Sequence, residues 1–545
     1  MSRLAELLPA LIVVVPILLA AAPIALGLRF DRTGWSVAAV TTTALFVATT
    51  YLAAAVYETG QVVHVLGGWD EPQGIGIELV ADEFSALIAL LVTVTAAGVL
   101  AYTRVGGPRG NTFYAGYLLL VGGLLGLSMT GDVFNMFVFL EIVGLATYAM
   151  IASGDGPESA VAALKYLILG TVGASMYLIG VGFLFMATGA LNMEVLGEAV
   201  PMVMAEGGGD VTLLRAAFAF IFVGFALKVA QWPLHTWQPD AYQHAPDGVT
   251  PLIAALVSTV SAYALGRVMY SVFGPEFLTA TPYLTEVVVT VGAVSVLAGS
   301  TLAVIQRDVT RMLAYSSVSQ FGLVVAAYGL VTQTAFVGAV VHLIGHGVMK
   351  AGLFVAAAVV AVSYGARTVD EYAALGKNRP VTAASMGVLL IALIGIPPSA
   401  GFIGKWYIAV GAVEAEVWAV AAVIFLSTML TLAYAARLLE TMYFTPATPA
   451  EAPHPPGTVA ADGGSGSTDP ADAGEGSGPA DDVTASDGGT ALESDSIRRG
   501  SPEAVSVGML ALLVAVAVSA VALGFAGGAF FEWLEPFTSE VFADG

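Results

Sequence analysis

Long apolar runs recur along almost the whole chain, and they constrain its fold more than any other feature. A helix needs about 20 mostly apolar residues to cross a hydrocarbon core roughly 30 Å thick. The chain is 57% hydrophobic and 11% charged, and its runs lack the alternating polarity that the strands of a membrane barrel would show. We therefore expect an all-α integral membrane protein with about fourteen transmembrane helices. The expected spans are residues 7–28, 35–57, 83–103, 112–130, 133–152, 160–188, 211–231, 249–272, 285–305, 311–331, 335–363, 381–410, 417–444 and 504–530.

Basic residues are distributed unevenly among the loops between these spans. Arginine and lysine near span ends are kept on the cytoplasmic side of a membrane, and here most of them follow odd-numbered spans, while the other side has only Arg3, Arg215 and Arg267. We expect a multi-pass protein of a prokaryotic plasma membrane with both termini outside. The first span resembles a signal peptide, with Arg3 ahead of it and small residues at 20–22, but it is long enough to cross the membrane and is expected to remain.

The segment 445–502 differs in composition from the rest of the chain. It is rich in Asp, Glu, Gly, Ser, Pro and Ala, so it buries too little apolar surface to offset the entropy of ordering. We expect a disordered acidic cytoplasmic loop that serves as a solvated spacer, with a regulatory role as the alternative. The formal net charge of -22 describes such aqueous parts, and together with the scarcity of lysine it is typical of halophile proteins.

Two of the expected helices are broken by proline. The seventh span meets Pro233 just after Lys228, and the twelfth contains Pro397 and Pro398 just before Lys405. Broken helices at corresponding places indicate a transporter built from inverted repeats. We expect two five-helix repeats, spans 4–8 and 9–13, and five parts of the chain. These are 1–111 with spans 1–3, 112–272 and 285–444 with the two repeats, 445–502 with the loop, and 503–545 with the last helix and an acidic tail.

Several ionisable residues lie inside apolar runs, where a lysine costs about 2.5 to 3.5 kcal/mol on insertion scales. Glu141 is the only charge in its run, and Lys228 is its natural partner. The pair predicts proton exchange, and the alternative is a static ion pair that joins two helices. Lys405 lies past a helix break, which predicts a lysine at the mouth of a polar pathway, although it has the length to reach the surface instead. Lys165, near the start of its span, either is functional or reaches the surface with no further role.

His342, His346 and Lys350 follow one another at i, i+4 and i+8, so they share one face of a helix. Imidazole accepts a proton at one nitrogen and donates at the other, which favours a proton relay. The alternatives are hydrogen bonds between helices or a metal site, and no further ligand is placed nearby for a metal. The chain has no cysteine, which excludes thiol catalysis, disulfides and iron–sulfur clusters, and it has no nucleotide fingerprint. We expect no cofactor, no bound metal and no nucleic-acid partner.

Four sequence blocks resemble the antiporter-type subunits shared by Mrp-type sodium/proton antiporters and respiratory complex I. They are 131–141 (GDVFNMFVFLE), 228–241 (KVAQWPLHTWQPDA), 311–320 (RMLAYSSVSQ) and 395–405 with GIPP and GFIGK, and the resemblance runs from about residue 82 to 444. It implies that Glu141 and Lys228 drive proton movement and that Lys405 is the lysine of the twelfth helix. A lysine there makes an MrpD-like or NuoN-like subunit the more natural assignment.

The chain departs from this family at one position. Members usually carry a lysine in the eighth helix, within a segment that resembles residues 255–264 (ALVSTVSAYA), and Thr259 stands in its place. A threonine hydroxyl passes a proton along but cannot store one. His342, His346 and Lys350 are therefore expected to carry the middle of the path.

The resemblance implies a proton-conducting subunit of a multisubunit Mrp-type monovalent cation (Na+)/proton antiporter. Its partners would be other subunits of the complex, the lipid bilayer, protons and Na+. A second interpretation is a NuoN- or NuoM-like proton-pumping subunit of an NADH:quinone or related oxidoreductase, to which the chain would bring no catalytic chemistry of its own. A third, prompted by Thr259, is a structural subunit that no longer conducts.

Overall fold

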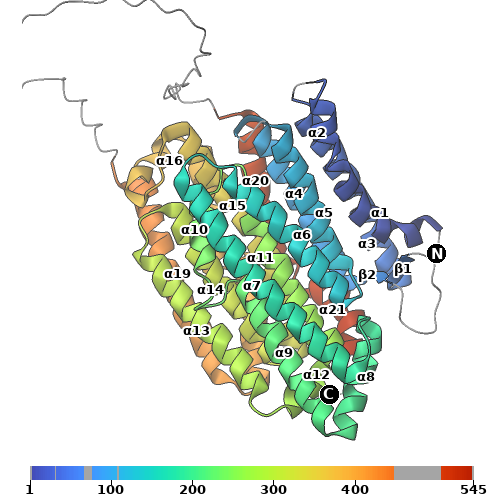
Figure 1. Ribbon diagram of the computed structural model, residues 1–545. Coiled ribbons are helices and arrows are strands. Elements are labelled where there is room, and N and C mark those ends of the chain that lie inside the picture. Colours follow the sequence, from blue (N-terminus) through green and yellow to red (C-terminus); the bar gives the residue numbers. More distant parts are fainter. Residues whose placement is uncertain (1–2, 31, 67–76, 107–109, 447–504, 543–545) are drawn as a thin grey trace, which may run out of the picture.

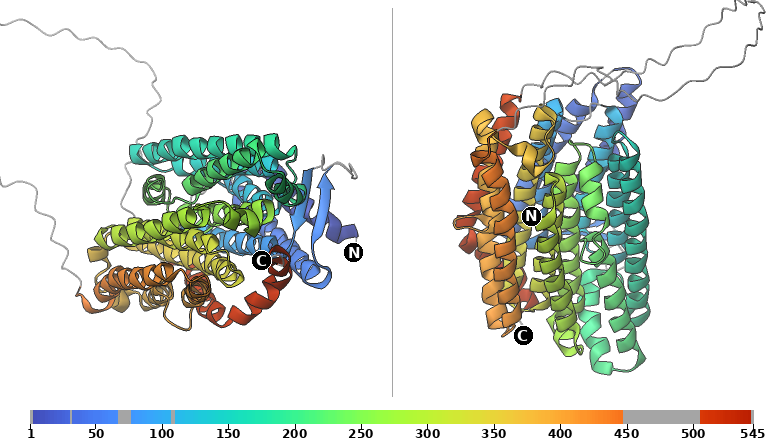
Figure 2. Two further views of the ribbon diagram at one scale, coloured as in Figure 1. Left: turned by 90° about the horizontal axis from the view of Figure 1, so that it is seen from below. Right: turned by 90° about the vertical axis from the view of Figure 1, so that its left-hand side faces the viewer.

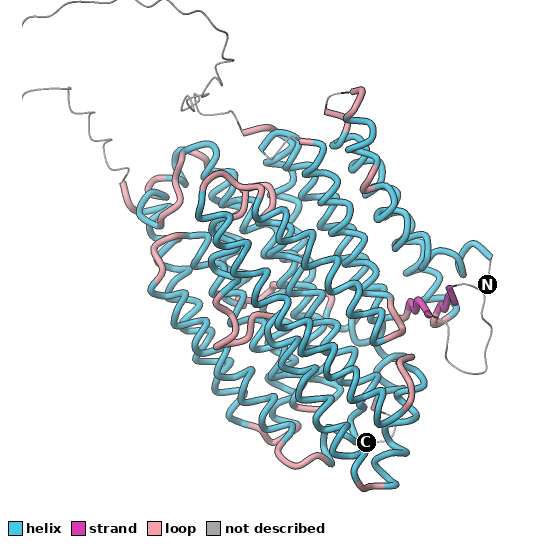
Figure 3. The backbone as a smooth tube through the Cα atoms, viewed as in Figure 1, coloured by secondary structure: helices cyan, strands magenta, loops and turns pink. Residues whose placement is uncertain are grey.

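The computed structural model describes residues 3–30, 32–66, 77–106, 110–446 and 505–542, and nearly all of them are helical (Figures 1 and 3). The first part of the chain forms α1 (Arg3–Leu19), α2 (Ala22–Gly27), α3 (Gly34–Thr59), α4 (Glu83–Gly106), α5 (Asn111–Met129), α6 (Val133–Ala152), α7 (Pro157–Thr188), α8 (Met193–Glu206), α9 (Gly209–Lys228), α10 (Trp237–His244) and α11 (Thr250–Arg267). The second part forms the π-helix η1 (Val268–Phe273), α12 (Gly274–Ala280), α13 (Leu284–Ile305), α14 (Val309–Gly329), α15 (Gln333–Tyr364), α16 (Leu375–Asn378), α17 (Pro380–Ile394), α18 (Ala400–Glu414), α19 (Trp418–Phe444), α20 (Val507–Ala522) and α21 (Gly527–Val541). The predicted acidic loop lies outside the described residues, apart from Thr445 and Pro446.

Twelve helices in the described ranges are long and apolar enough to cross a membrane. The other two expected spans correspond to α14, which has 21 residues, and to α17 and α18 together, which have 15 each. The chain is thus a multi-pass, predominantly helical membrane protein, as predicted. The count of fourteen spans and the two inverted repeats remain predictions.

The helices differ strongly in how far the rest of the protein covers them. We compare the share of residues that is buried in an 18-residue apolar stretch of each span. This share is 100% in the segment Thr250–Ala280 and 94% in α15, whereas it is 33% in α19 and 22% in the segment Val507–Phe525. Large apolar side chains such as Val518 and Phe425 are exposed on the outer helices, as expected where lipid replaces protein contacts. Helix α11 packs against α4, α5, α14 and α15, and α15 also packs against α17, α18 and α20. In Figure 2 the green-to-yellow middle of the chain lies between the teal and the orange helices. Helices α11 and α15 form the centre in which a polar pathway can be shielded from lipid.

Glycine permits close contact between two pairs of neighbouring helices. A Cβ atom on Gly292 of α13 would lie 2.4 Å from the Ala326 nitrogen of α14. In the other pair, a Cβ on Gly224 of α9 would lie 2.7 Å from the Gly173 carbonyl oxygen of α7. Small residues of this kind let helix backbones approach where no hydrophobic effect drives association.

Both predicted helix breaks are present. Helix α9 ends at Lys228 itself, and residues 229–236 form turns before α10 begins. Helix α17 ends at Ile394, and α18 starts after residues 395–399, where Ser399 caps it by accepting a hydrogen bond from the Phe402 amide at 3.2 Å. Each break leaves helix-end carbonyls without their intrahelical donors.

A feature that the apolar pattern does not predict is the antiparallel hairpin of β1 (Val62–Leu66) and β2 (Ile77–Ala81). It lies at the same end of the bundle as the start of α1 and the last helix, α21 (Figure 1). We call this the terminal end. The opposite end carries α2, α10 and α16 (Figure 1).

Candidate functional site

Polar side chains line up through the interior of the helix bundle, and every site residue predicted from the sequence is among them. All of these except Glu141 are almost fully buried, with 5% exposure or less. We call the set the polar row. It comprises Glu141 of α6, Lys228 of α9, Gln238 of α10, Ser258 and Thr259 of α11, Gln320 of α14, His342, His346 and Lys350 of α15, and Lys405 of α18.

Lys228 and Glu141 lie close together at one end of the row. The Lys228 ammonium is 3.3 Å from the point that a Cβ on Gly144 would occupy, and Gly144 is one helical turn from Glu141. No ion pair joins Lys228 and Glu141 in the described structure. Lys228 Nζ and Glu141 Oε1 are buried without a hydrogen-bond partner there. The predicted partners are therefore neighbours that need a small movement or a bridging molecule to connect.

Hydrogen bonds extend from the end of α9 into the centre of the bundle. Ser258 Oγ donates to the Lys228 carbonyl oxygen at 3.2 Å and lies 3.0 Å from the Gln238 amide nitrogen that donates to it. The next residue of α11, Thr259, has a fully buried hydroxyl without a protein partner within the described ranges. A Cβ on Gly347 of α15 would lie 3.3 Å from the Ala255 carbonyl oxygen, so α11 and α15 meet at this level.

The predicted face of α15 continues the row. Lys350 Nζ donates to the Leu313 carbonyl oxygen at 2.6 Å and to the Ser316 hydroxyl. The rings of His342 and His346 are 6.5 Å apart between centroids, and His342 Nε2 is 2.9 Å from the Gln320 side-chain oxygen. Neither ring nitrogen of His346 has a partner in the described part of the chain. The face thus alternates groups that are held in place with groups that are free to bind water or a proton.

Lys405 lies at the far end of the row, directly at the second helix break. Its ammonium donates to the carbonyl oxygens of Leu393, at 3.2 Å, and Ile394, at 3.0 Å. These are the last carbonyls of α17, where the helix dipole favours a cation. The lysine does not extend to the surface, because only 5% of it is exposed. A Cβ on the adjacent Gly404 would lie 2.7 Å from the His342 Cβ, which places Lys405 next to the histidines.

A partly exposed ion network lies outside the row, around the short helix α10. Asp240 accepts from Lys165 of α7 at 2.6 Å and from Arg311 of α14 at 2.7 Å. Burial opposes ionisation of this carboxyl, but the hydrogen bonds from Lys165 and Arg311 outweigh it and hold its pKa below the usual range. The network therefore ties α7 and α14 together through the segment that follows the first break. Lys165, for which the sequence left two interpretations, is part of this network.

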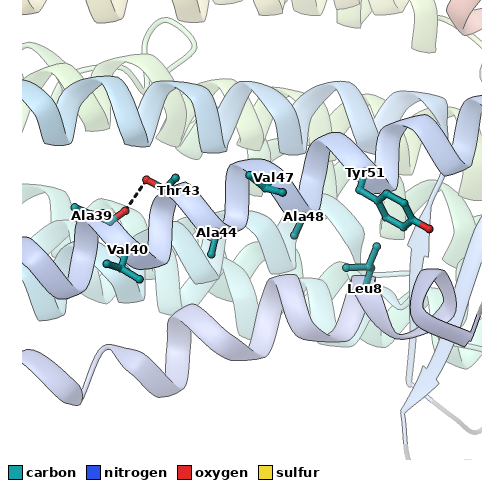
Figure 4. Close-up of a pocket in the computed structure, with 8 residues that line it drawn as sticks. All are labelled: Leu8, Ala39, Val40, Thr43, Ala44, Val47, Ala48 and Tyr51. Atoms are coloured by element: carbon teal, nitrogen blue, oxygen red, sulfur yellow. Dashed lines mark hydrogen bonds between the residues drawn. The ribbon is translucent and has the colours of Figure 1, made fainter.

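A groove of about 750 Å³ lies between α1 and α3 on the outside of the bundle (Figure 4). Its lining is apolar, with Leu8, Val40 and Tyr51 among the side chains, and the Thr43 hydroxyl within it donates to the Ala39 carbonyl oxygen at 2.7 Å. The groove contains no residue of the polar row. It is thus separate from the site.

Sequence reasoning missed three uncharged members of the row. Gln238, Ser258 and Gln320 lie in or next to sequence blocks that it singled out, but it placed no role on them because only charges and histidines stand out against an apolar background. These residues carry amide or hydroxyl groups that face the same interior as the lysines. That orientation becomes apparent only from the packing of the helices.

Comparisons with known proteins identify the family of the chain. Residues 130–431 match a family described as NADH:quinone oxidoreductase/Mrp antiporter, TM. The chain is 39% identical over 463 residues to the N subunit of the NADH-quinone oxidoreductase of Desulforudis audaxviator, covering 83% of this chain and 90% of that protein. It is 30% identical over 370 residues to the D subunit of the Na(+)/H(+) antiporter of Bacillus subtilis, covering 67% of this chain and 73% of that one.

A solved structure with the same fold belongs to the membrane-bound sulfane sulfur reductase, an archaeal respiratory membrane complex. The TM-score is 0.82 at 26% sequence identity, and the match covers 98% of this chain and 97% of that one. These relatives are all subunits of membrane complexes. The family match and the two relatives show that the chain belongs to the family of NADH:quinone oxidoreductase and Mrp antiporter membrane subunits.

Proposed function

We propose that this chain relays protons along the polar row as the proton-conducting subunit of a multisubunit Mrp-type monovalent cation (Na+)/proton antiporter. The observation that carries the proposal is the burial of three lysines, Lys228, Lys350 and Lys405, in one row with two histidines. Ionisable groups at membrane depth are costly and mark ion pathways. An ammonium without a fixed counter-charge is free to release its proton, and none of the three lysines makes an ion pair in the described structure.

In this mechanism a proton binds Lys228 while Glu141 stabilises the ammonium. When the two separate, the buried ammonium loses its compensating charge and releases the proton toward the centre of the bundle. The proton crosses the hydroxyls of Ser258 and Thr259 and reaches Lys350. From there the relay continues through the histidines of α15 to Lys405, whose ammonium is stabilised by the end of α17.

At Thr259 the relay has no group that can store a proton, so it depends on a neighbouring titratable residue. A hydroxyl both accepts and donates, so it carries a proton in transit but holds no charge. Lys350 supplies the titratable group in the middle. In the proposed arrangement both termini face outward and the acidic loop faces the cytoplasm, and partner subunits provide the counterflow of cations.

A second candidate is a proton-pumping membrane subunit of an NADH:quinone or related oxidoreductase. The 39% identity to an N subunit over most of both chains favours it. The polar row would serve the same proton transfer, and electron transfer in partner subunits would drive it. The proteins that copurify after gentle solubilisation distinguish the two, because iron–sulfur subunits would accompany only the second complex.

The decisive experiment replaces Glu141 by Ala and by Gln and measures the pH change in everted vesicles on addition of Na+, or of a reduced electron donor for the second candidate. We expect both variants to lose the pH change while the complex still assembles. Glu158→Gln is the matched control, because Glu158 is an exposed glutamate in the first turn of α7. Normal transport in both Glu141 variants would contradict the relay and favour a structural, non-conducting subunit.

A further inference from the structure

One face of α11 carries polar side chains from the level of the polar row to the terminal end. Thr259, Tyr263 and Arg267 follow at i, i+4 and i+8, which covers about 12 Å along the helix axis. All three are buried, and Tyr263 donates to the Ser128 carbonyl oxygen of α5 at 2.7 Å. Neither Tyr263 nor Arg267 belongs to the relay described above. The face is a second polar line that starts at the row and leads away from it.

A buried ion pair closes this line. Arg267 donates to Asp82 at the start of α4, and the two side chains are 9% and 8% exposed. The backbone amide of Ser85 holds the other Asp82 oxygen at 2.8 Å. A pair removed from water at this depth contributes little to stability compared with an apolar replacement. Its presence at the end of a polar line therefore favours a functional explanation.

The last helix of the chain covers the pair. The Phe537 ring of α21 packs on the Arg267 guanidinium, 5.4 Å from the ring centroid, and contacts Phe84 and Phe336 at 5.5 and 5.6 Å between centroids. The Trp533 indole of the same helix donates to the Glu83 carbonyl oxygen at 2.9 Å. Glu540, one turn beyond Phe537, is exposed and acts electrostatically on Arg267. The pair is thus separated from the terminal end by one aromatic layer, with the exposed Glu540 one turn beyond Phe537.

We propose that the Asp82–Arg267 pair is the gate through which protons leave the polar row at the terminal end, with α21 as its cover. A proton arriving along the α11 face forms an O–H bond with the Asp82 carboxylate, which weakens its attraction for Arg267. The bond breaks when the proton passes to water beside Glu540. This gate rests on the proton relay proposed above.

The test uses the whole complex in proteoliposomes that contain a pH-sensitive dye. Asp82→Asn keeps the shape of the side chain but removes the charge, and we expect driven proton transport to fall about tenfold. The matched control is Asp247→Asn, because Asp247 pairs with Arg367 in a half-exposed contact far from α21. Wild-type transport in the Asp82→Asn variant would overturn the gate.

The cover is tested separately by the passive proton leak under an imposed membrane potential. Phe537→Ala opens the aromatic layer and should raise the leak about threefold, whereas Phe425→Ala, on the lipid-facing side of α19, should leave it unchanged. An unchanged leak in the Phe537 variant would contradict the seal.

Two further variants keep the outcomes separable. If Asp82→Asn does not assemble because Arg267 is left buried and unpaired, the double variant Asp82→Asn with Arg267→Gln removes both charges and should assemble. Wild-type transport in that double variant would equally overturn the gate. Glu141→Ala distinguishes the two proposals: transport that survives this change refutes the relay itself, whereas loss of transport there with normal Asp82 and Phe537 variants refutes only the gate.

Discussion

Replacing Lys350 by methionine tests the centre of the proposed relay, and the structure predicts that stability and transport will respond differently. A lysine at the middle of a span costs about 2.5 to 3.5 kcal/mol to insert. Its two hydrogen bonds, to the Leu313 carbonyl and the Ser316 hydroxyl, stabilise the folded protein by about 1.5 to 3 kcal/mol each. They therefore approximately offset the cost of inserting the lysine. Ser316 keeps its own bond to the Leu313 carbonyl at 2.8 Å after the change. We therefore expect stability to change by no more than about 2 kcal/mol.

Transport should respond strongly, because methionine cannot carry a proton. We expect the rate of cation-driven pH change in everted vesicles to fall to about a tenth or less at equal amounts of assembled complex. Lys350→Arg should fail as well, since a guanidinium stays charged and cannot pass its proton on. Lys377→Met is the matched control, because Lys377 is exposed in a loop helix. Wild-type transport in the Lys350→Met variant would refute the reasoning, because it would leave the middle of the path without a titratable group.

Three further predictions concern single contacts. Gln320→Leu removes the partner of His342 and should cost about 1 to 3 kcal/mol in thermal unfolding of the purified complex; an unchanged melting temperature would show that the bond is not retained. Gly292→Val drives a side chain into the backbone of α14 and should abolish accumulation of folded protein, whereas Gly182→Val meets open space and should be tolerated; equal yields on size exclusion would contradict the packing. Asp240→Asn should cost about 1 kcal/mol, because the network is partly exposed. Since the pKa of Asp240 is lowered in the folded state, the stability difference between wild type and Asp240→Asn should be present above about pH 4 and disappear at lower pH. A stability difference that grows on acidification would contradict the lowered pKa.

The fold class followed from the sequence because membrane insertion leaves few solutions. Long apolar runs must be helices in lipid, and proline within them must break them, so the breaks after Lys228 and after Ile394 were both predicted correctly. The hairpin of β1 and β2 was not predicted, because its strands have five residues each, too few to cross a membrane, and they lie between the spans.

The candidate site was predicted from charged residues and histidines inside apolar runs, with Thr259 added by the family resemblance. The prediction was incomplete for other uncharged side chains. A lysine in an apolar run is conspicuous whatever its neighbours, so Lys228, Lys350 and Lys405 could be named. Gln238 and Gln320 gain meaning only from the groups they touch. The expected contact of Glu141 with Lys228 is a proximity without an ion pair in the described structure.

The sequence by itself determined that this protein is a bundle of membrane helices with protonatable groups inside. Because burying charge in lipid is costly, the spans are apolar, and the few ionisable residues within them stand out. Only the tertiary structure decided which of these groups face one another. Lys405 donates to the last carbonyl of α17. The sequence identified Arg267 only as one of three basic residues on the outer side. In the structure it pairs with Asp82, 185 residues away in the chain, and the last helix covers it. Packing between segments that are distant in the sequence determines such partners, and the local sequence pattern does not predict them.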